Sequence, residues 1–302
     1  MKIIETDALH IAYLDDGAHT GWPVILSHGF PYDVHAFDDV VPALVAAGAR
    51  VIRPWCRGFG GTRFKSSACI RSGQQAARAL DIVHLADALG LHQPVLAGFD
   101  WGGNASCAAA ALWPDRFGAL VSYGGYDVID VQQQLQPAAP ALERTCWYQH
   151  LFQSERGRKC LYENRQALCR LLWRDWSPGW VFDDSTYDRS AASFDNPDFV
   201  EVVIHCYRWM AGAEAGNPDL QPLENKLAQR PLITIPAVTL DGIRDPLKPD
   251  GTAHHARLFA GRHSHRSATC GHNFPQEQPD VFARAILDVK HWFTTQERGS
   301  SA

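Results

Sequence analysis

Residues 95–104 constrain the fold of this chain more than any other stretch. An apolar run leads into Gly-Phe-Asp-Trp-Gly-Gly at residues 98–103, and an alanine-rich run, 104–112, follows at once. Gly98 and Gly102 flank Asp100 at a spacing typical of a sharp turn from a strand into a helix, which lifts the central side chain clear of the sheet. A Cβ at either glycine would crowd such a turn. We therefore expect a strand, a strained turn and a helix here.

The residue at the centre of this turn, Asp100, is an aspartate, whereas serine or cysteine would be typical of acyl transfer. A carboxylate in this place indicates covalent catalysis through an ester to an electrophilic carbon. The structural alternative is a helix cap, because aspartate is common at helix starts. Short motifs often match by chance, so the rest of the chain has to decide.

Length and composition limit the classes of protein to consider. The 302 residues, 46% of them apolar and 20% charged, can bury a large core in one domain or in one domain with an insertion. A net charge of −5 makes nucleic acid and anionic membranes poor partners. No apolar run approaches the ~20 residues that span a bilayer. Residues 1–7 place acids where a signal peptide has its apolar segment, so we expect a soluble, cytoplasmic protein.

Neither a metal nor a cofactor is expected. The eight cysteines are never spaced as C-x-x-C, which argues against a zinc site. The glycine-rich loop 57–62 lacks the Lys-Ser/Thr pair of a phosphate-binding loop. The histidines at 254–255, 263 and 265 fall in or beside surface segments, where solvation is the simplest interpretation.

The pattern along the chain predicts an α/β fold with a mostly parallel, doubly wound sheet and one interruption. The expected elements up to residue 125 are a hairpin over 2–14, strands at 24–27, 50–55, 95–98 and 119–123, and helices at 40–47, 72–89 and 104–112. Residues 126–230 read as helices, at 142–152, 158–172 and 199–209. Strands are expected again at 233–240 and 264–269, with helices at 252–259 and 279–293. We predict a core domain of residues 1–125 and 231–302, with a helical cap, 126–230, inserted in it.

Polar side chains follow several of these strands. Ligands of open α/β sheets bind at the carboxyl ends of the strands. His28 and Asp100 each follow a strand there, and so do His272 and the pair Asp241 and Asp245. The chain order nucleophile, acid, histidine is the one α/β-hydrolases use, with either aspartate of the pair as the acid.

The motifs resemble the α/β-hydrolase superfamily along nearly the whole chain, and its epoxide hydrolases most. Residues 98–103 resemble the elbow G-x-D-W-G-G of these enzymes, and residues 28–31 resemble their H-G-F-P loop. Segment 240–246 resembles the L-x-G-x-x-D turn, which favours Asp245 over Asp241 as the acid.

Two segments of the predicted cap resemble those that carry ring-opening tyrosines. They are Trp-Tyr-Gln-His-Leu-Phe-Gln at 147–153, with Tyr148, and Tyr-Arg-Trp-Met at 207–210, with Tyr207. Trp209 stands where the family has asparagine, and Trp147 where an acidic residue often precedes the first tyrosine. Without these flanking segments both tyrosines would be interpreted as packing, because aromatic side chains usually belong to cores.

The resemblance implies hydrolysis of an epoxide to a vicinal diol. Asp100 would form an alkyl ester while Tyr148 and Tyr207 donate to the epoxide oxygen. The backbone N–H groups of Phe30 and Trp101 would form the oxyanion hole, and water activated by the Asp245–His272 pair would hydrolyse the ester. The side chains expected to contact the substrate are His28, Pro31, Trp147, Phe152, Trp209 and Phe274. The implied partners are a small hydrophobic epoxide and water, and a homodimer is compatible with this interpretation.

Two other functions stay open. A haloalkane or haloacid dehalogenase uses the same aspartate, but a haloacetate enzyme would show D-R-x-x-R at the elbow, and a haloalkane enzyme often has asparagine where Phe30 stands. A non-catalytic ligand-binding protein of this fold is the alternative of a different class. Such a protein often loses a member of the triad, and this chain has candidates for all three.

Overall fold

A sheet of nine strands forms the centre of the computed structural model, which describes residues 1–300 and the side chains through residue 295. The strands lie in the order β1 (Lys2–Glu5), β2 (Leu9–Asp16), β4 (Ala49–Pro54), β3 (Trp22–Ser27), β6 (Val95–Gly98), β7 (Ala119–Tyr123), β8 (Ala237–Gly242) and β9 (His263–Ala268), with β5 (Arg63–Phe64) beside β2. β2 pairs antiparallel with β1, β4 and β5, and the pairs that run from β4 through β3, β6, β7 and β8 to β9 are all parallel. The predicted α/β fold is confirmed.

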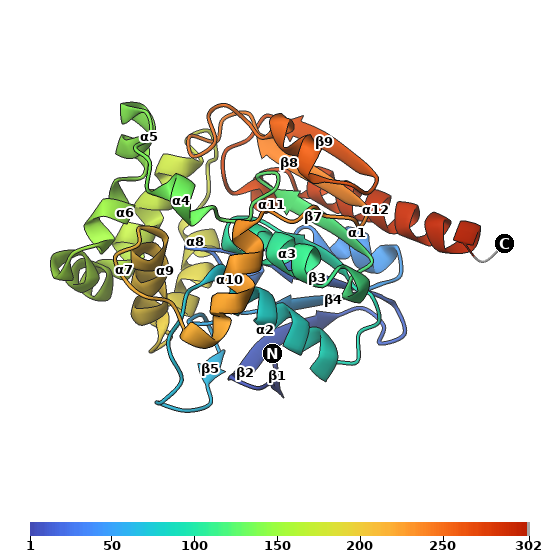
Figure 1. Cartoon of the computed structure of the whole chain (residues 1–302), viewed down its shortest axis with the longest axis horizontal. Helices are drawn as coiled ribbons and strands as arrows, with labels where there is room; N and C mark the ends of the chain where they lie inside the picture. Colours follow the sequence, from blue (N-terminus) through green and yellow to red (C-terminus); the bar gives the residue numbers. More distant parts are fainter. Residues whose placement is uncertain (301–302) are drawn as a thin grey trace.

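Helices cover both faces of this sheet (Figure 1). α1 (Val41–Ala46) and α12 (Pro279–Ser300) pack on one face, and α2 (Gln75–Ala88), α3 (Trp101–Leu112) and α10 (Gln221–Ala228) on the other. The central strands are therefore buried on both sides, which explains why β3, β6 and β7 are unbroken runs of apolar and small residues.

A group of helices lies to one side of the sheet, at the left of Figure 1. We call residues 131–210 the inserted segment. It contains α4 (Val131–Gln134), α5 (Pro140–Thr145), α6 (Trp147–Phe152), α7 (Glu155–Trp176), α8 (Asp184–Ala191), η3 (Ala192–Asp195) and α9 (Phe199–Met210). Helix α10 falls inside the predicted cap range of 126–230, yet it packs on α2 and α3 of the core, because its apolar face fits those helices.

Three local predictions differ from the structure. The single helix expected over 142–152 is two helices, α5 and α6, with Cys146 at the break. The strand expected over 233–240 begins only at Ala237, because Pro236 cannot donate to the ladder. The helix expected over 252–259 is the 3₁₀ turn η5 (Ala253–Leu258). None of the described helices combines the length and the apolar character needed to cross a membrane.

Candidate active site

The turn between β6 and α3 holds Asp100 in a backbone conformation with φ of 53° and ψ of −131°. A Cβ on Gly102 would lie 1.9 Å from the carbonyl oxygen of Ser27, and one on Gly98 would lie 2.5 Å from the Gly102 backbone. Only glycine fits at either place. The turn can therefore form only with these two glycines, and it costs backbone strain that the packed sheet has to sustain.

The two oxygens of the Asp100 carboxylate have different surroundings. Oδ1 accepts hydrogen bonds from the backbone N–H groups of Phe30, at 2.7 Å, and Trp101, at 2.6 Å. The first turn of α3 also points at this carboxylate, which favours its negative charge. Oδ2 lies 3.1 Å from Nε2 of His272. One oxygen is fixed between two donors, and the other faces the histidine.

The loop that supplies the Phe30 N–H approaches the carboxylate closely. A Cβ on Gly29 would lie 2.1 Å from Oδ1 of Asp100. His28 is fully buried, and its two ring nitrogens engage the backbone: Nε2 accepts from the Cys56 N–H at 3.0 Å, and Nδ1 lies 3.0 Å from the Gly29 oxygen. His28 therefore holds the loop in place, and both of its ring nitrogens are occupied.

The loops after β8 and β9 place an acid behind the histidine. Nδ1 of His272 lies 2.8 Å from Oδ2 of Asp245, which also accepts from the Tyr123 hydroxyl at 2.7 Å. The Leu247 N–H donates to the other oxygen of Asp245 at 2.8 Å. Asp241 instead accepts hydrogen bonds from the N–H and the hydroxyl of Thr252.

Charge decides the protonation of this pair. Burial disfavours the charged imidazolium, but the carboxylates of Asp245 and Asp100 outweigh it and raise the pKa of His272 to about 10. Burial likewise opposes ionisation of Asp245, yet His272 and the donors around it lower the pKa of that carboxyl. At neutral pH the histidine is a cation between two carboxylates.

The two tyrosines of the inserted segment meet over the elbow. Their rings are perpendicular, with centroids 5.2 Å apart. Tyr148, from α6, lies 6.4 Å from the Phe30 ring, and Tyr207, from α9, lies 5.7 Å from Phe30 and 5.8 Å from Trp101. Burial, together with the Asp100 charge, holds the pKa of both phenols well above the ordinary value. Both are therefore neutral hydrogen-bond donors.

The side chains expected to contact a substrate divide into two groups. Phe152 is fully buried against Phe30 and both tyrosines, so it belongs to the aromatic cluster beside Asp100. Trp147 packs edge-on against Tyr148. The Pro31 carbonyl accepts from Nε1 of Trp173 at 2.7 Å and joins the loop to α7.

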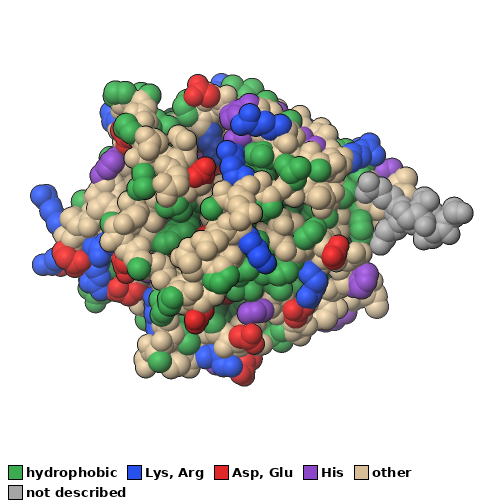
Figure 2. All heavy atoms as spheres, in the orientation of Figure 1, with side chains coloured by type: hydrophobic (Ala, Val, Ile, Leu, Met, Phe, Trp, Pro, Cys, Tyr) green, Lys and Arg blue, Asp and Glu red, His purple; other side chains and the backbone are tan. Residues whose placement is uncertain are grey.

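Trp209 and Phe274 lie elsewhere. Trp209 lines an open groove of about 550 Å³ between the inserted segment and α10, and Figure 2 shows this face hollowed there. Phe274 packs 5.3 Å from the Tyr123 ring, behind the acid. The size and polarity of Trp209 and Phe274 do not show, from the sequence alone, whether these side chains contact a substrate or support the core.

Three aromatic residues around the histidine were not predicted. Tyr123 fixes Asp245, and its place as the last residue of a strand could have indicated it. Trp176 lies 5.1 Å from Tyr148 and 5.3 Å from His272. Tyr32 lies 6.2 Å from His272. Among the residues that the structure describes, the buried Trp176 N–H and Tyr32 hydroxyl have no hydrogen-bond partner.

Known proteins share this fold. A family model described as the alpha/beta hydrolase fold matches residues 23–157. A crystal structure from Klebsiella pneumoniae, of a protein provisionally named an epoxide hydrolase, is 41% identical with a TM-score of 0.93, and the match covers 96% of this chain and 97% of that one. The chain belongs to the α/β-hydrolase family.

Curated relatives match this chain over shorter stretches. An epoxide hydrolase of Caballeronia sordidicola is 32% identical over 117 residues, which is 39% of this chain and 34% of that protein. A haloalkane dehalogenase of Psychrobacter cryohalolentis is 34% identical over 118 residues, 39% of this chain and 38% of that protein. These matches span little more than a third of each relative. The chain is an epoxide hydrolase-like member of the α/β-hydrolase family.

Proposed function

We propose that this protein hydrolyses epoxides to vicinal diols through an ester on Asp100. The observation that carries the proposal is the common wall of Phe30 and Trp101. Their backbone N–H groups hold one oxygen of Asp100, and their rings pack against Tyr207, which meets Tyr148. A strained ring placed between carboxylate and phenols meets a nucleophile on one side and proton donors on the other.

In the first step Oδ2 of Asp100 attacks a ring carbon. The carbon–oxygen bond opposite breaks, and the departing oxygen takes a proton from the phenol pair. Oδ1 remains between the N–H groups of Phe30 and Trp101 as the carbonyl oxygen of the new ester. The helical inserted segment acts as a cap that holds the phenols over the nucleophile and excludes bulk water.

Formation of the ester changes the histidine. The negative charge of Asp100 and its hydrogen bond both help to raise the pKa of His272, and both are lost when Asp100 is alkylated. His272 can then release its proton to restore the phenol and become a base. It takes a proton from water, the hydroxide adds to the ester carbonyl, and the oxyanion forms on Oδ1. Collapse of this intermediate breaks the bond between the carboxyl carbon and Oδ2. The proton of the added hydroxyl passes through His272 to the leaving oxygen, so the diol departs and the Asp100 carboxylate and protonated His272 are restored. Asp245 balances the charge of His272 throughout.

A dehalogenase would use the same first step with halide as the leaving group. Trp101 follows the nucleophile, and its indole N–H could hold a halide. Phe30 offers no second donor from its side chain, and the paired phenols suit an oxygen that needs a proton. We therefore favour the epoxide as substrate.

One single-turnover experiment in heavy-oxygen water with styrene oxide tests the ester. The first diol should carry unlabelled oxygen, and mass spectrometry should find the label in the peptide that contains Asp100. Label in the first diol would show direct attack of water and contradict the proposal. A panel of terminal, internal and aryl epoxides beside haloalkanes tests the substrate, and faster halide release would support the dehalogenase.

A further inference from the structure

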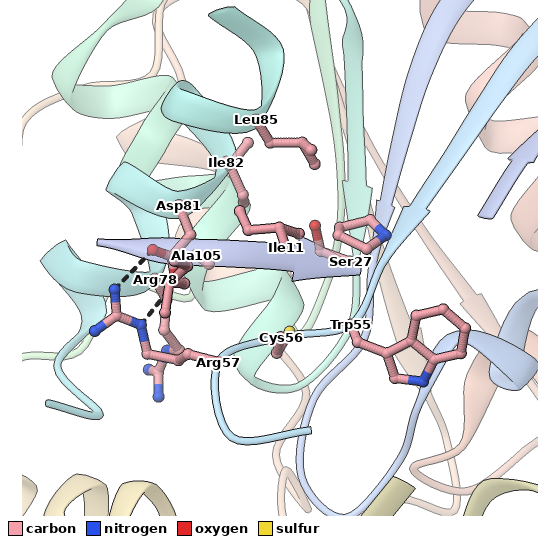
Figure 3. Close-up of a pocket in the computed structure, with 12 residues that line it drawn as sticks. Ile11, Ser27, Trp55, Cys56, Arg57, Arg78, Asp81, Ile82, Leu85 and Ala105 are labelled. Carbon is pink, nitrogen blue, oxygen red and sulfur yellow. Dashed lines mark hydrogen bonds and ion pairs between the residues drawn. The ribbon is translucent and has the colours of Figure 1, made fainter. Parts of the chain in front are cut away.

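Arg78 is a buried cation without an ion pair. It projects from α2, is 3% exposed, and among the side chains that the structure describes no carboxylate lies within ion-pair distance of it. The neighbouring Arg57 differs, because it forms a two-pronged pair with Asp81, drawn as dashed lines in Figure 3. A buried charge is costly unless other groups compensate it.

The contacts of Arg78 join three helices at the elbow. Nη2 donates to Oδ1 of Asn104, in the first turn of α3, at 2.5 Å. Nη1 donates to the Gly73 carbonyl at 2.9 Å and to Sγ of Cys206, the residue before Tyr207 on α9, at 3.1 Å. The guanidinium carbon lies 4.7 Å from the centroid of the Trp101 ring, which is cation–π distance. One side chain thus touches the oxyanion-hole residue and the segment that carries a phenol.

Arg78 forms no ion pair with a described carboxylate, whereas the triad carries an excess of negative charge. Asp100 and Asp245 contribute −1 each and the protonated His272 contributes +1, so the triad carries a net −1. Arg78 contributes +1 against the ring of Trp101, the residue that follows Asp100. Two thiols are influenced by both charges: burial is the main cause that raises the pKa of Cys56 and of Cys206, and on each the charge of Arg78 lowers the pKa and that of Asp100 raises it.

We propose that Arg78 is the counter-charge and positioning residue of the Asp100 site. It holds Trp101 and the Tyr207 segment against the elbow helix, and it balances the negative charge that the carboxylate carries before alkylation and that the ester oxygen acquires during hydrolysis. This extends the proposed function and, for its catalytic part, rests on it.

A double-mutant cycle tests the counter-charge without any substrate. Arg78→Met should lower the urea midpoint in the wild-type background and should lower it by less than half as much in the Asp100→Asn background, where the charge to be balanced is gone. Arg57→Met is the matched control: it removes another buried arginine that contacts α2, and its cost should be equal in both backgrounds. Equal costs of Arg78→Met in both backgrounds would overturn the proposal.

A second background separates Asp100 from another carboxylate. Glu224 is buried, accepts from the Ala76 N–H and the Gln75 amide at 3.0 Å each, and is within electrostatic reach of Arg78. In a Glu224→Gln background the cost of Arg78→Met should be unchanged. If the cost of Arg78→Met fell in the Glu224→Gln background and not in the Asp100→Asn background, Glu224 would be the counter-charge of Arg78. That result would contradict the inference.

Kinetics with styrene oxide test the positioning. Because the oxyanion forms during hydrolysis of the ester, Arg78→Met should slow hydrolysis about tenfold more than alkylation, so quenched samples should contain more alkylated protein than wild type. Arg78→Lys keeps the charge but lacks the planar fork, and it should retain coupling to Asp100 in the cycle. Alkylation and hydrolysis slowed equally would indicate a structural role only. If the wild-type protein formed no ester, the proposed function would be refuted. The double-mutant cycle needs no substrate, so it would still show whether Arg78 and Asp100 are coupled.

Discussion

At the residue scale, the chemistry of this site depends on how Asp100 and His272 share charge. The carboxylate has one oxygen bound by two N–H groups and the other facing Nε2 of His272. The protonated histidine therefore stabilises the folded resting enzyme, yet it has to lose its proton before it can act as a base. In the proposed mechanism, alkylation of Asp100 removes the negative charge that keeps the proton on His272.

A first prediction concerns the pH dependence of folding. The pKa of His272 is raised from 6.5 to about 10 by two buried carboxylates, against the effect of burial. Its stabilisation is therefore complete below pH 6.5 and is lost as the pH rises through about 10, by several kcal/mol in all. Urea denaturation between pH 6 and 10 should show a falling free energy of unfolding. His272→Gln should remove most of this slope, and an unchanged slope would contradict the assignment of the proton to His272.

A second prediction separates the phenols from ordinary aromatic packing. Tyr148→Phe and Tyr207→Phe should each slow alkylation by styrene oxide about tenfold to a hundredfold, because one proton donor remains, and the double variant should lose about 10²- to 10⁴-fold. Stopped-flow tryptophan fluorescence or quenched mass spectrometry measures this step. Tyr187→Phe is the control, since its buried hydroxyl donates to the Gln166 carbonyl within the inserted segment. If all three single variants were alkylated at the same rate, the hydroxyl groups of Tyr148 and Tyr207 would have no chemical role.

At the element scale, the elbow joins the end of β6 to the start of α3 by a tight turn whose glycines have no room for a side chain. The helix begins directly after Asp100, so its first N–H groups point at the carboxylate, and Gly102 lies against the backbone of β3. The motif was readable in the sequence because this close approach excludes every side chain. The break between α5 and α6 was not readable, because local helix propensity continues through Cys146 and only packing against α7 and α9 separates the two.

A third prediction follows from this contact. Gly102→Ala places a methyl group 1.9 Å from the Ser27 oxygen, a rigid backbone atom, so the free energy of unfolding should fall by about 3 kcal/mol or more and ester formation should be lost. Gly90→Ala is the control. Gly90 follows the end of α2 with φ of 61°, but a Cβ there meets nothing within 4 Å, so the cost should be about 1 kcal/mol from backbone strain alone. Chemical denaturation compares them, and equal costs would show that the elbow can relax.

At the scale of the whole molecule, the inserted segment is attached to the core by buried polar contacts beside the oxyanion loop. Asp33, fully buried after that loop, accepts from the hydroxyls of Ser190 and Ser193 at 2.7 Å each. Trp173 donates to the Pro31 carbonyl in the same region. These contacts attach α7, α8 and η3 to the core, and α7 packs against α6 and α9, the helices that carry the two tyrosines.

A fourth prediction tests this attachment. Ser190→Ala and Ser193→Ala each leave the buried Asp33 carboxylate short of a donor, so each should cost about 1–3 kcal/mol of unfolding free energy. Hydrogen exchange should also become faster across residues 184–195. Ser185→Ala is the control, because the exposed Ser185 hydroxyl bonds only to Asp183 and its loss should change little. Unaltered exchange in the serine variants would show that apolar packing alone holds the segment.

The sequence by itself determined the α/β fold, the elbow and the order of nucleophile, acid and histidine. These depend on short-range facts: unbroken apolar runs, glycines that admit a sharp turn, and polar residues at strand ends. The motif at 240–246 already favoured Asp245 over Asp241, and Asp245 does meet His272. Tertiary structure alone decided that His28 supports the loop and that Trp209 faces a separate groove. It also brought Arg78 behind Trp101. Each of these is a contact between residues far apart in the chain, and spacing along the sequence carries no information about which distant side chains share one small buried volume.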